Sequence, residues 1–128
     1  MIPVVIDASH IEVHNYDSVK KDFYAWLEQE IDAQIREDVP YHGHTVITPR
    51  AHISRFANNY AGYKGATTQE SCKHYSALAT IFTADLAVEE VVQWVQKTYG
   101  GAGWRIKVRP PTTPRNPQLD IVLSKREV

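Results

Sequence analysis

The C-terminal part of the chain alternates apolar and polar residues in two short stretches separated by a proline-rich segment. The first alternates Trp104, Ile106 and Val108 with Arg105, Lys107 and Arg109, and the second alternates Leu119, Ile121 and Leu123 with Asp120, Val122 and Ser124. Because successive side chains of a strand point to opposite faces, the stretches predict strands at 104–109 and 119–124, each with one buried face. Prolines at positions 110, 111, 114 and 117 cannot donate to a ladder. The sequence therefore predicts a C-terminal β-hairpin with a stiff, protruding loop that carries Arg115.

A segment near the N-terminus carries apolar residues at the spacing of an amphipathic helix. They are Val19, Phe23, Trp26, Leu27, Ile31 and Ile35, three or four residues apart. Asp17 or Ser18 can cap the start of this helix. Pro40 predicts its end, because proline disfavours helical geometry at Val39. We expect an acidic helix over residues 17 to 37.

Two further helices are expected in the middle of the chain. Thr48 followed by Pro49 predicts the start of one, with Gly62 as its left-handed stop. Its inner stripe would be Ile53, Phe56, Ala57 and Tyr60, with Arg50, His52, Arg55, Asn58 and Asn59 facing outward. Thr67 with Glu70 resembles a capping box that opens the next helix. The inner stripe of that helix would be Cys72, Tyr75, Leu78, Ala79 and Phe82.

A fourth helix is expected at 84–99, capped by Thr83 and ended by the glycines at 100 and 101, unless the third and fourth helices form one bent rod. One or two short strands, interrupted near Ser9, are expected over residues 3–6 and 11–14, and another around Val46 and Ile47. We predict one α+β domain over residues 1–128, with about four helices packed on a small antiparallel sheet that ends in the C-terminal hairpin. The expected core includes Phe23, Trp26, Ile53, Val91, Trp104, Ile106, Leu119 and Ile121.

Length and composition agree with a globular protein. A chain of 128 residues with 43% hydrophobic and 23% charged residues can bury a core without disulfide or metal support. The lone cysteine, Cys72, excludes an internal disulfide and is typical of a reducing compartment, so we expect a cytoplasmic protein. No apolar run is long enough to cross a membrane, and the first nine residues lack the features of a signal peptide.

Charge is sorted along the chain. Residues 1–40 hold nine acidic and three basic residues, whereas residues 41–128 hold eleven basic and six acidic ones. Clustered cations are typical of proteins that contact nucleic acid or other anionic partners. We therefore predict a non-enzymatic module that binds nucleic acid through a basic helix face and the hairpin. The candidate contact residues are Arg50, Arg55, Lys64, Gln69, Lys73, His74, Arg105, Lys107, Arg109 and Arg115.

The expected order of elements is similar to that of a winged helix-turn-helix domain. That arrangement implies that the third helix, with Gln69, Lys73 and His74, enters the major groove while the hairpin touches the backbone. The expected fourth helix and the leading strand at 3–6 depart from it.

Other functions fit parts of the sequence. The acidic helix could meet the basic surface of another copy or of a second protein, as in an assembly protein such as a small accessory or virus-encoded regulator. The histidine pairs His10 with His14 and His42 with His44, or Asp7 at a strand end, could belong to a small metal-dependent hydrolase, but further ligands are missing. Cys72 and His74 point in different directions on a helix, which argues against a nucleophile and its base. We predict no cofactor and no metal, and expect Tyr63 alone of the central tyrosines to be free for a partner.

Overall fold

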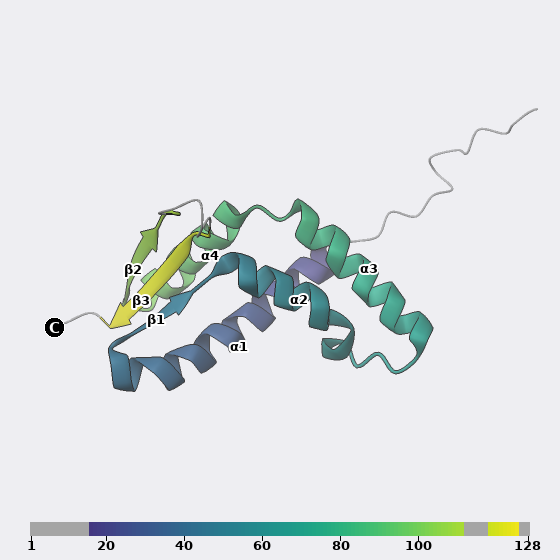
Figure 1. Cartoon of the computed structure of the whole chain (residues 1–128), viewed down its shortest axis with the longest axis horizontal. Coiled ribbons are helices and arrows are strands. Elements are labelled where there is room, and N and C mark those ends of the chain that lie inside the picture. Colours follow the sequence, from purple (N-terminus) through teal and green to yellow (C-terminus); the bar gives the residue numbers. More distant parts are fainter. Residues whose placement is uncertain (1–15, 112–117, 126–128) are drawn as a thin grey trace, which may run out of the picture.

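The computed structural model describes residues 16–111 and 118–125, which form four helices and a three-stranded antiparallel sheet. In chain order the elements are α1 (Tyr16–His42), β1 (His44–Ile47), α2 (Pro49–Tyr63), α3 (Gln69–Asp85), α4 (Val88–Gly101), β2 (Trp104–Arg109) and β3 (Asp120–Lys125). The sheet lies at one end of the molecule with α4 behind it, and α3 lies at the other end (Figure 1). The predicted α+β class, with helices on a small antiparallel sheet and a C-terminal hairpin, is confirmed.

The helix α1 continues through the proline that was expected to end it. Pro40 lies in its last turn, and the helix ends at His42. The stop is supplied by Gly43, whose φ of +76° suits glycine and whose N–H donates to the Val39 carbonyl at 2.8 Å. A proline this close to the end removes few helical bonds, so the prediction of an end at Pro40 was wrong. The strand expected around residues 46 and 47 follows directly as β1.

The start of α3 and the end of α2 are each displaced from their predicted positions. Thr68, not Thr67, caps α3: its side chain accepts from the Ser71 N–H at 3.1 Å, and Ser71 Oγ accepts from the Thr68 N–H at 3.3 Å. A serine therefore takes the place expected for Glu70, because its hydroxyl can also accept this bond. The left-handed glycine after α2 is Gly65, with φ of +72°, and not Gly62, which is helical.

The boundary between α3 and α4 lies later than predicted. Thr83 does not cap a helix but lies inside α3, where its hydroxyl donates to the Ala79 carbonyl at 2.8 Å. The two helices are separate, with a break at Leu86 and Ala87. Thr48 does precede α2, but its hydroxyl makes no cap; it donates to Asp120 Oδ1 at 3.0 Å instead.

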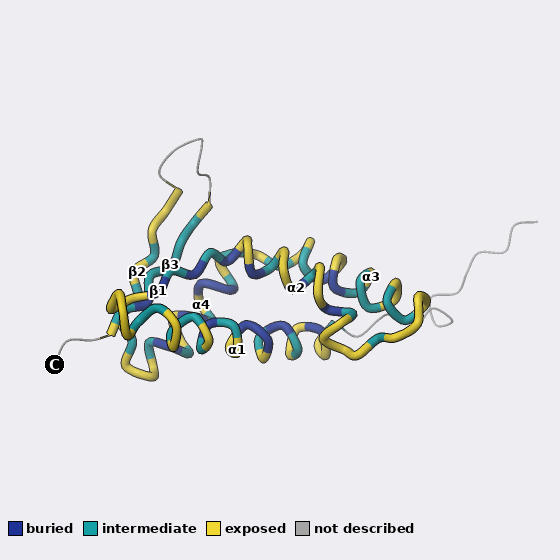
Figure 2. The backbone as a smooth tube through the Cα atoms, turned by 60° about the horizontal axis from the view of Figure 1, so that its bottom comes forward, coloured by how far each residue is buried: buried dark blue, intermediate teal, exposed yellow. Residues whose placement is uncertain are grey.

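The C-terminal hairpin forms as predicted. β2 spans the expected residues 104–109, and β3 begins one residue late, at Asp120 instead of Leu119. Its register pairs Arg105 with Ser124 and Arg109 with Asp120. β3 also pairs with β1, so β3 is the central strand. Figure 2 shows the far ends of β2 and β3 projecting beyond the helices.

The core lies between α1, α2 and α3 and continues between the sheet and α4. Its centre is an aromatic cluster in which the Phe23 ring lies 5.1 Å from that of Phe56 and 5.8 Å from that of Phe82. Of the predicted core residues, four are buried, Phe23, Trp26, Val91 and Ile121, and four pack against them half-buried, Ile53, Trp104, Ile106 and Leu119.

One residue of α2 is buried although the sequence placed it on the surface. His52 is 4% exposed, because it continues the buried row formed by Phe56 and Tyr60 at intervals of four residues. Its ring lies nearly perpendicular to that of Trp26, with 6.1 Å between the ring centres. The expected outward orientation of His52 was therefore wrong, while Arg50, Arg55, Asn58 and Asn59 are exposed as predicted.

Two buried tyrosines fix α1 to the elements around it. The Tyr60 hydroxyl, from α2, donates to Asp22 Oδ2 at 2.7 Å, and the Tyr99 hydroxyl, from α4, donates to Asp32 Oδ1 at 2.8 Å. Burial raises the pKa of both phenols well above their ordinary range, and the carboxylate acceptors raise it further. Both tyrosines therefore stay protonated and act as donors.

The strands expected at 3–6 and 11–14, with Asp7, His10 and His14, lie outside the described residues. So does the hairpin loop with Arg115.

Candidate nucleic-acid interface

The outer face of the sheet carries a row of cations on β2. Directly paired residues of an antiparallel sheet share a face, so the register fixes which side chains lie together. The inner face carries Trp104, Ile106 and Val108 with the buried Ile121 and Leu123. The outer face therefore carries Arg105, Lys107 and Arg109, next to Asp120, Val122 and Ser124 of β3 and His44 and Val46 of β1.

The charges on this face are unequal. Asp120 is its one carboxylate among the described residues, and it accepts from Arg109 Nη2 at 3.4 Å and from the Thr48 hydroxyl at 3.0 Å. Arg105 and Lys107 are exposed and make no ion pair within the described part of the chain. Three cations and one carboxylate leave the face with a net charge of +2. Such a surface attracts anions.

Two cations at α2, Arg55 within the helix and Lys64 directly after it, have a different environment. Arg55 Nη2 lies 3.0 Å from Glu30 Oε2 and its guanidinium lies 6.0 Å from the centre of the Trp26 ring. Lys64 Nζ lies 3.2 Å from Asp22 Oδ2, the oxygen that also accepts from Tyr60. Both carboxylates belong to α1, so the acidic N-terminal part of the chain neutralises part of the basic remainder. These two candidate residues join α2 and the residue that follows it to α1.

The other candidate residues are exposed but lie elsewhere. Arg50 lies in the first turn of α2 and borders a shallow pocket of about 690 Å³ with Thr80 and Thr83. Gln69, Lys73 and His74 begin α3 at the end of the molecule opposite the sheet (Figure 1). The ten candidate residues were expected to form one surface. The nine that are described instead occupy separate places, and only Arg105, Lys107 and Arg109 form a row.

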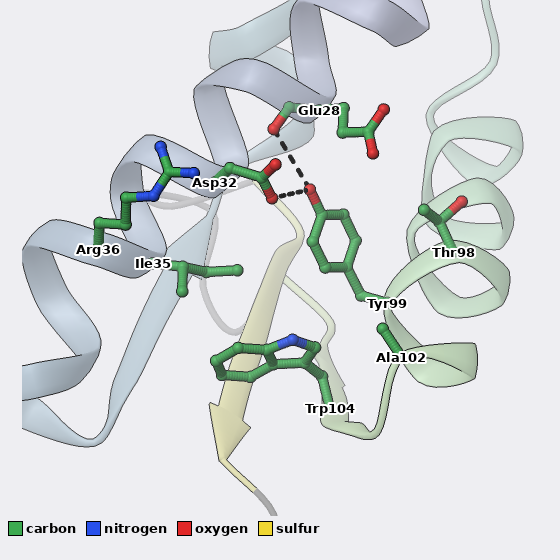
Figure 3. Close-up of a pocket in the computed structure, with 8 residues that line it drawn as sticks. All are labelled: Glu28, Asp32, Ile35, Arg36, Thr98, Tyr99, Ala102 and Trp104. Atoms are coloured by element: carbon green, nitrogen blue, oxygen red, sulfur yellow. Dashed lines mark hydrogen bonds between the residues drawn. The ribbon is translucent and has the colours of Figure 1, made fainter.

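A second pocket, of about 380 Å³, lies between α1, α4 and the start of β2 (Figure 3). Glu28 and Asp32 line one side of it, Tyr99 and Trp104 the other, and Arg36 its rim. The Tyr99 hydroxyl that donates to Asp32 also lies 3.3 Å from the Glu28 carbonyl oxygen. Sequence reasoning did not single out this pocket, because its residues come from three distant segments.

The described residues give no support to metal or thiol chemistry. No group of three or more potential metal ligands occurs among them. His44 Nδ1 lies 3.0 Å from the His42 carbonyl oxygen, so this ring is engaged by the backbone. The half-buried Cys72 thiol donates to the Ala66 carbonyl at 3.8 Å. Tyr63, 42% exposed as expected for the accessible member of the tyrosine cluster, stacks on Tyr60.

No protein-family model matches this chain, nor does any curated protein or solved structure at a significant level. Within the described residues, every helix is too short or too polar to span a bilayer.

Proposed function

We propose that this protein is a non-enzymatic binding module that contacts nucleic acid through the outer face of its C-terminal hairpin. The observation that carries the proposal is the row of Arg105, Lys107 and Arg109 on a face of the sheet where Asp120 is the single carboxylate that the described residues supply. Alternate residues of a strand lie about 6.6 Å apart, because the strand rises about 3.3 Å per residue. Cations at this spacing can follow a phosphodiester backbone.

The chemistry of the face suits phosphate contact. Besides Asp120, Ser124 and His44, its side chains are the three cations of β2 and the aliphatic Val46 and Val122. Cations reach phosphate oxygens without reading bases. We therefore expect binding with little sequence preference. The hairpin, rather than a helix in the major groove, is the contact that the geometry favours, because Gln69, Lys73 and His74 lie at the opposite end of the molecule (Figure 1).

The test is fluorescence anisotropy with labelled duplex and single-stranded oligonucleotides between about 50 and 200 mM salt, a range over which phosphate contacts weaken steeply. We expect affinity to fall linearly on a log–log plot. Lys107→Met should reduce the magnitude of the slope by about 0.9 for the duplex and about 0.7 for the single strand, the contribution of one phosphate contact. The matched control is Lys97→Met, which removes the same charge from α4 behind the sheet, and should leave the slope unchanged. Binding that is absent at low salt, or a slope that Lys97→Met alters as much as Lys107→Met, overturns the proposal.

A protein-interaction module is the second candidate. It is favoured by the edge of β2, which no strand of the described residues pairs and which the sheet order leaves open to another strand. Sedimentation at low and high salt without nucleic acid tests self-assembly through complementary charges, which salt would weaken.

A further inference from the structure

The edge of the sheet formed by β2 has no neighbouring strand among the described residues. The direction of its backbone groups follows from the ladder. The Lys125 N–H donates to the Gly43 carbonyl at 3.4 Å, so the backbone groups of Lys125 face β1. Because these groups alternate along a strand, those of Ser124 face β2, where the paired residue is Arg105. Hence the N–H and C=O groups of Trp104, Ile106 and Val108 point outward from the free edge.

The opposite edge of the sheet is closed. There Gln34, on α1, donates from Nε2 to the Val46 carbonyl at 3.0 Å and to Thr45 Oγ1 at 3.3 Å. Thr45 in turn donates to Asp38 Oδ2 at 2.7 Å. Side chains of α1 therefore satisfy an outward backbone group of β1 and hold the helix against that edge. The edge of β2 has no such cover among the described residues.

The side chains of β2 specify what such a strand must carry. On the outer face, residues beside Arg105, Lys107 and Arg109 are favourable when they are acidic, because opposite charges on neighbouring strands attract. On the inner face, Trp104, Ile106 and Val108 are only half-buried and gain by contact with apolar side chains. An extended segment that alternates acidic and apolar residues meets both requirements.

A second copy of the chain meets them less well. Antiparallel pairing of two β2 strands centred on Ile106 would place Arg105 opposite Lys107 of the other copy, and like charges in direct opposition are destabilising. Cations on an edge strand are a known protection against such self-pairing. Charge complementarity thus favours an acidic partner.

We propose that the free edge of β2 binds an extended, acidic protein segment by antiparallel strand addition, and that this segment competes with nucleic acid for Arg105 and Lys107. Backbone bonds from Trp104, Ile106 and Val108 supply the affinity, and the two faces supply the selectivity. Strand addition requires no nucleic acid, whereas the competition rests on the proposed function.

The pairing geometry yields a test on the peptide. The probe is an acetylated six-residue peptide of alternating glutamate and valine, the length of β2. Residues directly opposite Ile106 share its inner face and exchange backbone bonds with it, so the valines carry the amides that bind β2. Methylation of the valine amides should therefore weaken binding on the order of 100-fold, since about three hydrogen bonds are lost. Methylation of the glutamate amides should leave binding nearly unchanged.

The protein variant that matches this test is Val108→Pro. It removes one outward N–H but no hydrogen bond to β3. An edge strand tolerates proline at such a position, because the N–H that is lost points away from the sheet. We expect it to lose about tenfold in affinity for the peptide while its affinity for the oligonucleotide is retained. Circular dichroism checks its fold, and the methylated peptides test the proposal on the unaltered protein if this variant unfolds.

The outcomes separate the two proposals. Equal binding of both methylated peptides, or equal binding of a peptide with its glutamates and valines in separate blocks, overturns strand addition and leaves charge attraction alone. Self-association that Val108→Pro abolishes would replace the acidic segment with a second copy. Peptide binding without any oligonucleotide binding overturns the proposed function. It also removes the proposed competition, but strand addition at β2 stands.

Discussion

Two cations at α2, Arg55 in the helix and Lys64 directly after it, differ in ion pairing from two cations of β2, Arg105 and Lys107. Arg55 and Lys64 each meet a carboxylate of α1, at 3.0 and 3.2 Å. Arg105 and Lys107 meet none among the described residues. The difference teaches that a basic cluster in a sequence overstates the binding surface, because some of its cations form ion pairs with carboxylates of the same chain. Only the cations left without such a pair are available to a partner. Here two carboxylates of α1 pair with Arg55 and Lys64, whereas Arg105 and Lys107 have no paired carboxylate among the described residues.

The largest expected effect is on nucleic-acid affinity when charge is reversed in the two places. Arg105→Glu with Lys107→Glu should reduce oligonucleotide affinity by at least about 100-fold near 100 mM salt, because two phosphate contacts become repulsive. Arg55→Glu with Lys64→Glu makes the same change of charge but should weaken binding far less. Anisotropy titrations of the two double variants decide the comparison.

The stability of the two double variants should show the reverse order. The α2 pair places a glutamate beside Glu30 and another beside Asp22, so unfolding should need less urea, whereas the hairpin pair should change stability little. If both variants lose affinity equally, overall charge and not the hairpin face governs binding, and the contrast between the two sets of cations has no functional meaning.

The attachment of α1 can be broken through the buried phenols. Tyr60→Phe removes the hydrogen bond to Asp22 and should lower the free energy of unfolding by about 1.5 to 3 kcal/mol, as expected for a bond to a charged acceptor. Urea denaturation measures it. The control is Tyr63→Phe, which alters an exposed phenol beside it and should change stability by less than about 0.5 kcal/mol. Equal effects would mean that Asp22 finds a full replacement partner in Lys64.

Neutralising one paired cation of α2 should have a smaller effect. Arg55→Met ends the ion pair with Glu30, and should cost less than about 1 kcal/mol because both groups are partly solvated. The difference from the unaltered protein should shrink with added salt, which screens exposed charges. Arg50→Met, at the exposed start of the same helix, should show neither the cost nor the salt dependence. A larger loss would assign the effect to the contact of Arg55 with Trp26.

Periodicity in the sequence predicted the elements well because each repeats a local rule. The alternation of Trp104, Ile106 and Val108 with cations gave β2 within its bounds, and the apolar spacing from Val19 to Ile35 gave α1. Helix ends were predicted less well, because several residues could supply each cap. Thr67 and Thr68 are the same residue type, so either could cap the helix. Only the path of the backbone decides that Thr68 accepts the hydrogen bond from the Ser71 N–H.

The site was less predictable than the fold. Strand parity alone predicts that Arg105, Lys107 and Arg109 share one face, but it could not reveal that Asp120 would lie among them. Nor could sequence spacing show that Glu30 and Asp22 would reach α2, since these pairs join residues 25 and 42 positions apart. Partners brought together by folding decide which cations stay available, and a linear pattern does not contain that information.

The smallest expected effect is a pH dependence of stability that arises from His52, a buried residue of α2. Burial lowers the pKa of His52 below 6.5, the nearby Arg55 lowers it further, and Glu30 opposes them. The unfolded chain therefore binds a proton near pH 6.5 that the folded protein takes up only at lower pH, so stability falls as the pH drops below about 6.5. His52→Leu removes this proton uptake and also a ring nitrogen, Nδ1, that has no hydrogen-bond partner. The free energy of unfolding from urea titrations at several pH values should decline less steeply below pH 6.5 in this variant than in the unaltered protein. Parallel pH profiles would show that the His52 ring takes up its proton as readily in the folded as in the unfolded chain. The ring would then be as accessible to water as the exposed cations of α2.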